Sequence, residues 1–121
     1  MVPKALRTWF VIHFAIDWLF AIPLMIAPSA TLNLLGWETV DPVATRLVSA
    51  ALLAIGGESL RMRHASADGF RTMLDLKLIW SASAMLGLAW SGLSGGPGMV
   101  WGFLVIFAIF FGVWWFYRRK L

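Results

Sequence analysis

Five ionisable residues stand inside strongly apolar segments of this sequence: His13, Asp17, Arg46, Glu58 and Lys77. Burying such groups in a bilayer is costly, and those that are kept there commonly mark a ligand site or a proton pathway. His13 and Asp17 are four residues apart, so they share one face of a helix. We therefore take these five residues as candidates for binding a ligand or a proton, with Asp17 at the centre.

Two ion pairs are expected among them. At ~1.5 Å of rise per residue, Asp17 and Arg46 should lie within a few Å of the same depth, which favours an Asp17–Arg46 pair. Glu58 is the natural partner of Lys77 nearer the end of the helices. Each group also has a purely structural interpretation. The two members of an ion pair can simply neutralise one another, and a side chain near the interface can extend its charged end into water. A structural clamp and a functional pocket both stay open.

The other polar residues indicate little further chemistry. Asp75 can meet Arg71 four residues before it. The two histidines, His13 and His64, do not form a haem or metal pattern, and the absence of cysteine excludes thiolate ligands and disulfides. We predict no metal site and no catalytic residue and leave the cofactor open. An enzyme using His13 and Asp17 as acid and base ranks last, because nothing indicates a substrate.

The composition places these residues in a membrane protein. The chain has 121 residues, of which 60% are hydrophobic and 13% are charged, and its mean hydropathy is +0.80. Soluble domains carry roughly 45–50% apolar and about 25% charged residues, so an ordinary soluble globule is excluded. A pI of 10.4 would otherwise raise nucleic acid as a partner, but we assign the basic residues to membrane topology and expect the lipid bilayer as the partner.

Four apolar runs predict four membrane-spanning helices, at about 5–27, 42–60, 70–93 and 99–117. The first run is too long for a signal peptide and has Asp17 at its middle, so we expect a retained helix that kinks at Pro23. The predicted fold is all-α: one transmembrane domain over residues 1–121, built as an antiparallel four-helix bundle.

The connections contain clear boundary signals. Ser29 as a cap and Gly36 as a terminator predict a short interfacial helix between the first two spans. Asp41 followed by Pro42 predicts the start of the second span, and the glycine-rich turn at 94–98 ends the third. Tryptophans favour the membrane interface, and four are expected there as anchors: Trp9, Trp37, Trp114 and Trp115.

The basic residues predict the orientation. Arg46 falls toward one side of the four-helix path, and the other basic residues fall on the opposite side: Lys4, Arg7, Arg61, Arg63, Arg71, Lys77, Arg118, Arg119 and Lys120. By the positive-inside rule, both termini and the middle connection face the cytoplasm of a cell membrane.

Small residues allow helices to approach closely in lipid. The second and third spans each carry a stripe of them, which predicts close contact between these two helices: Ala50, Ala54 and Gly57, and Ser83, Gly87 and Ser91.

The segment PLMIAPSATLNLLGWETVDPVATRLVSAALLAIGGESL, residues 23–60, resembles the first half of the small four-helix membrane proteins of the DoxX-like group and related families. In that group the first helix ends near a proline and the second opens with an arginine ahead of small residues. Arg46, Ala50, Ala51 and Gly56 occupy those places, although Ser49 and Ala50 stand where a glycine is frequent. The resemblance covers about a third of the chain. It implies association with quinone-linked oxidoreductases or with the assembly of partner membrane proteins.

Two classes of function follow as hypotheses. The favoured one is a binding or accessory protein whose polar interior holds a lipophilic molecule, such as a quinone or lipid, or steadies a membrane partner. The alternative is a small proton-coupled transporter, similar to the small multidrug resistance group, with Asp17 as the coupling carboxylate. Those transporters often insert in both orientations, which the strong basic bias here opposes. A parallel homo-oligomer stays open.

Overall fold

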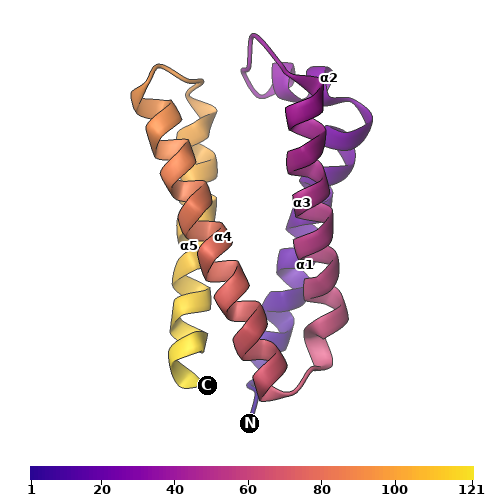
Figure 1. The fold of residues 1–121 in the computed structure, drawn as a ribbon, viewed down its shortest axis with the longest axis vertical. Helices are drawn as coiled ribbons and strands as arrows, with labels where there is room; N and C mark the ends of the chain where they lie inside the picture. The colour runs from indigo at the N-terminus through magenta and orange to yellow at the C-terminus, as the bar shows by residue number, and fades with distance from the viewer. The chain divides into compact units, whose positions relative to one another are not determined.

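The computed structural model describes residues 1–121 and contains helices and no strand (Figure 1). The elements are α1 (Lys4–Ile26), α2 (Pro28–Leu34), α3 (Pro42–Arg61), the 3-10 turn η1 (Met62–His64), α4 (Ala67–Leu93) and α5 (Met99–Lys120). Four helices are long and apolar enough to cross a membrane: α1, α3 continued through η1, α4 and α5. The all-helical prediction and its four apolar spans are therefore confirmed.

The chain divides into two compact units, which we describe separately: residues 2–65, with α1, α2, α3 and η1, and residues 66–121, with α4 and α5. Within each unit the two long helices pack against one another. Both pairs are antiparallel, because contacts that move toward the C-terminus of one helix move toward the N-terminus of the other.

Several predicted boundaries are confirmed. The Asp41 carboxylate accepts hydrogen bonds from the backbone N–H groups of Val43 at 2.9 Å and Ala44 at 3.3 Å, and Pro42 is the first residue of α3. This satisfies donors that have no partner within the helix. Gly36 and Gly95 have φ angles of 103° and 89°, a region that favours glycine, and each reverses the chain just after a helix.

Two boundaries differ from the prediction. The short helix α2 begins at Pro28 and not after Ser29, because the ring of proline already holds the φ angle that the first turn needs. The helix α4 begins at Ala67, before the predicted position of about 70. Ser66 caps it there by accepting a hydrogen bond from the N–H of Gly69 at 3.4 Å.

The buried faces of the first unit repeat every three or four residues. They comprise Leu6, Phe10, His13, Asp17, Ala21 and Leu24 of α1 and Thr45, Ser49, Leu52, Gly56 and Ser59 of α3. This spacing places one continuous line of side chains along each helix, as in helices that pack side by side over several turns. Two ionisable residues of α1, His13 and Asp17, lie on this line.

Candidate functional site

His13 and Asp17 form a buried pair at the middle of α1. His13 is 3% exposed and Asp17 is 6% exposed, and His13 Nε2 lies 3.3 Å from Asp17 Oδ2. Their spacing of one helical turn brings the two side chains together on the face that packs against α3. The predicted association of these two residues is therefore present in the structure. The pair can exchange a proton between an imidazole and a carboxylate.

Gly56 of α3 makes room for the Asp17 side chain. A Cβ atom at Gly56 would lie 2.7 Å from Asp17 Cβ and 3.1 Å from Trp18 Cδ1. The distance to Asp17 Cβ is shorter than real Cβ atoms show. The α3 backbone therefore touches α1 at the carboxylate. Small residues permit this kind of backbone approach between helices.

Serine and tryptophan side chains hold the α1–α3 pair in register through hydrogen bonds to backbone carbonyls. Ser59 Oγ donates to Phe10 O at 2.8 Å, and Ser49 Oγ donates to Ala21 O at 2.6 Å. Between them, the indole Nε1 of Trp18 donates to the carbonyl oxygen of Leu53 at 3.2 Å. These bonds lie before and after the His13–Asp17 pair along α1, so they fix where α3 meets the pair. None of these three donors was predicted from the sequence.

The predicted Asp17–Arg46 ion pair does not form. Arg46 is exposed, and its Nε donates to the carbonyl oxygen of Met25 at 3.0 Å. Met25 follows Asp17 by eight residues, or about 12 Å of helical rise. The estimate of equal depth was wrong because the register of the antiparallel pair places Gly56, and not Arg46, beside Asp17.

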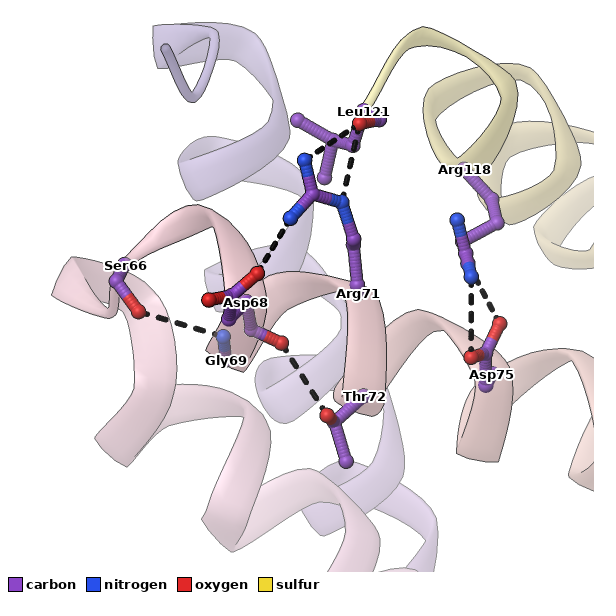
Figure 2. A network of polar contacts seen from close by, with 8 residues as sticks. All are labelled: Ser66, Asp68, Gly69, Arg71, Thr72, Asp75, Arg118 and Leu121. Atoms are coloured by element: carbon purple, nitrogen blue, oxygen red, sulfur yellow. Dashed lines mark hydrogen bonds and ion pairs between the residues drawn. The ribbon is translucent and has the colours of Figure 1, made fainter.

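The predicted Asp75–Arg71 pair is also replaced by other contacts (Figure 2). Asp75 receives two hydrogen bonds from Arg118 of α5, from Nε to Oδ1 at 2.6 Å and from Nη2 to Oδ2 at 3.3 Å. Arg71 donates to Asp68 and also to the carbonyl oxygen of Leu121, at 3.0 and 2.7 Å. The partner of the Asp75 carboxylate is therefore Arg118 on the facing helix α5, and not Arg71 on the same helix.

Lys77 and Trp114 form a second buried group, within the α4–α5 unit. Both side chains are fully buried, and Lys77 Nζ lies 4.8 Å from the centre of the Trp114 ring. A cation over an indole face is attracted by the electron density of the ring. Trp114 also stacks on Phe110, with ring centres 5.5 Å apart. The prediction that Trp114 anchors the interface is therefore wrong, because its ring is enclosed by protein.

The remaining candidates are more peripheral. Glu58 is half-buried and forms an ion pair with Arg61, 3.5 Å away and three residues later. Its predicted pairing with Lys77 would join the two units and stays a prediction. Trp9 and Trp37 are half-buried, and Trp115 is exposed, so these three remain candidates for interface anchors.

The small-residue stripes of α3 and α4 lie outside the faces that pack within each unit. Their predicted contact with one another would join the two units and stays a prediction. Ser83, Gly87 and Ser91 of α4 are exposed, as are Ala50 and Ala54 of α3.

An apolar depression of about 380 Å³ lies on the last turns of α4 and the following residue, lined by Leu86, Ala89, Trp90, Leu93 and Ser94. None of the candidate site residues lines it. No group of three or more His, Cys, Asp or Glu side chains is positioned to hold a metal ion.

The chain matches no protein-family model, no curated protein and no solved structure. The candidate site therefore depends on the residues and their geometry. Its members in the first unit are His13 and Asp17, with Gly56 and Trp18 packed around the carboxylate.

Proposed function

We propose that the protein spans a cell membrane four times, as an antiparallel four-helix bundle with both termini in the cytoplasm. The supporting observations are the four long apolar helices and the exposed apolar side chains that each of them carries, such as Leu19, Leu47, Trp90 and Ile109. A soluble protein rarely exposes so much apolar surface, whereas lipid tails cover it without cost. The bias of basic residues supports the orientation.

Within this membrane protein, we propose that the His13–Asp17 pair binds the polar head of a lipophilic molecule. The single observation that carries the proposal is the burial of both ionisable groups at mid-span, 3.3 Å apart. Such groups are expensive to keep in a membrane, which favours a functional role over a purely structural one. A ligand group that shares the proton of the pair would stabilise the charged form of both residues.

A quinone or a lipid is the proposed class of ligand. An imidazole N–H can donate to a quinone carbonyl, and a carboxylate can accept from a hydroxyl of a quinol or lipid. The adjacent rings of Phe14 and Trp18, whose centres are 5.2 Å apart, offer aromatic surface beside the pair. The resemblance of residues 23–60 to the DoxX-like group also favours a quinone-linked or accessory role.

The proposal is tested by ligand binding to the purified protein in lipid nanodiscs. A short-chain ubiquinone is titrated, and the quenching of tryptophan fluorescence reports binding. Asp17→Asn and His13→Gln should each weaken binding roughly tenfold or more, the effect of losing a hydrogen bond to a charged group. The chain offers matched controls: Asp75→Asn changes an exposed carboxylate, and His64→Gln changes an exposed histidine.

The controls separate a site from a general loss of fold. Circular dichroism and size-exclusion chromatography must show that each variant keeps its helices and its size. Binding at the wild-type level by folded Asp17→Asn and His13→Gln would exclude the pair as the ligand site. If the ubiquinone does not bind at all, mass spectrometry of lipids that co-purify with the wild type, but not with Asp17→Asn, supports the lipid class instead.

Proton-coupled transport is the second candidate, favoured by the proton-sharing geometry of His13 and Asp17. In proteoliposomes with an imposed pH gradient, the transport hypothesis predicts uptake of a lipophilic cation by the wild type. Asp17→Asn should abolish this uptake and Asp75→Asn should preserve it. Absence of proton-driven uptake in the wild type would exclude transport of this probe and leave ligand binding as the remaining function.

A further inference from the structure

The last two turns of α5 carry three aromatic residues, each followed four positions later by a basic residue. The pairs are Trp114 with Arg118, Trp115 with Arg119, and Phe116 with Lys120. Four residues of an α-helix rise about 6 Å, so each cation stands one turn beyond its ring along the axis. The three pairs differ in what surrounds them.

The first pair faces α4 and is fully engaged. Trp114 is buried beneath Lys77, and Arg118 makes two hydrogen bonds to the Asp75 carboxylate (Figure 2). Arg71 of α4 also holds the carbonyl oxygen of Leu121. The charge of Arg118 is therefore neutralised within the protein.

The other two pairs point away from α4. Trp115 and Phe116 are each 52% exposed, and Arg119 and Lys120 are exposed as well. The Lys120 Nζ lies 4.6 Å from the centre of the Phe116 ring, and neither Arg119 nor Lys120 has a carboxylate partner. This face of α5 thus presents two uncompensated positive charges one turn beyond two exposed rings.

We propose that this outward face of α5, formed by Trp115, Phe116, Arg119 and Lys120, binds the headgroup of an anionic phospholipid. The rings suit the boundary between acyl chains and headgroups, where aromatic side chains settle. Arg119 and Lys120 follow one turn further along the helix, and Lys120 can extend from its place over the Phe116 ring toward the phosphates. Each basic residue near an anionic surface contributes roughly a fivefold preference. Charge complementarity and exposed rings at the apolar end favour a lipid over an acidic protein. The proposal requires membrane insertion but not the His13–Asp17 ligand site.

The test measures lipid preference at the protein surface. The full chain is reconstituted in phosphatidylcholine vesicles with spin-labelled phosphatidylglycerol or spin-labelled phosphatidylcholine, and electron paramagnetic resonance gives the relative association of each lipid. The wild type should prefer phosphatidylglycerol. Arg119→Gln should reduce the preference roughly fivefold and Arg119→Gln/Lys120→Gln further. High salt should weaken the wild-type preference, because the interaction is between exposed charges.

Arg118→Gln is the matched control, since it removes the same charge from the adjacent residue but from the inward face. It should leave the preference close to that of the wild type. An equal loss in Arg118→Gln and Arg119→Gln would overturn the proposal, because net charge and not this face would then set the preference. Equal association of both lipids with the wild type would also overturn it and leave an acidic protein as the candidate partner. These results do not depend on ubiquinone binding, so the two proposals fail separately.

Discussion

At the scale of single residues, Gly56 determines how closely α3 approaches the buried carboxylate. Its neighbour Gly57 provides a comparison, since a Cβ atom there would meet only Trp18, at an ordinary 3.7 Å, whereas at Gly56 it would lie 2.7 Å from Asp17 Cβ. Both glycines lie within α3, so their replacement by alanine changes helix propensity in the same way. The difference between the two substitutions therefore isolates the contact with Asp17.

We predict that Gly56→Ala destabilises the protein by about 1–3 kcal/mol, as overpacking commonly does, because Asp17 and the α1 backbone must move. Gly57→Ala should be neutral or stabilising by up to about 1 kcal/mol, through its higher helix propensity. Unfolding in detergent, followed by loss of helical circular dichroism as denaturant is added, gives both values. Equal stability of the two variants would show that α3 does not press against Asp17.

The residues of the candidate site could be identified from the sequence, but their contacts with the neighbouring helix could not. Two polar residues one turn apart on an apolar helix were enough to predict the His13–Asp17 association, since a single helix determines their geometry. The partner of Arg46 could not be predicted in this way. It depends on the register of α1 against α3, where a shift of two turns separates Asp17 from Met25.

At the scale of elements, the helix boundaries were predictable because local signals set them. The Asp41–Pro42 start, the turn after Leu93 and the four apolar lengths agree with the structure. The packing faces were less predictable. The sequence indicated Ala50, Ala54 and Gly57 as the stripe of α3 that contacts α4, which would join the two units and stays a prediction. It did not indicate the buried stripe that packs against α1, which lies about 100° around the helix.

The buried stripe of α3 was overlooked because it mixes polar and apolar types. Ser49 and Ser59 are buried only because each donates to a carbonyl oxygen of α1, at Ala21 and at Phe10. These two serines mark a helix contact because their hydroxyls donate across it, whereas Ser83 and Ser91 of α4 are exposed. The two serines alternate with Leu52 and Gly56 at spacings of three and four residues. This pattern could have located the face of α3 that packs against α1.

At the scale of the whole molecule, the distribution of charge makes a prediction that the helices alone do not. Helix length and hydropathy support four crossings, but either orientation would satisfy them. The basic residues favour one of the two, because all of them except Arg46 and the buried Lys77 fall near the ends that four crossings would place on one side. The absence of cysteine makes this testable with single reactive positions in an otherwise unlabelled chain.

We predict that Thr39→Cys and Ser94→Cys react with a membrane-impermeant thiol reagent added to intact cells, and that His64→Cys reacts only after the membrane is permeabilised. All three positions are exposed. Thr39 and Ser94 lie between spanning helices and His64 is the last residue of the second span, so access to the reagent depends on the side of the membrane. Four crossings with cytoplasmic termini require this alternation. If only His64→Cys is labelled in intact cells, the protein has the opposite orientation. Partial labelling of all three would indicate insertion in both directions, which removes the main argument against the transport hypothesis.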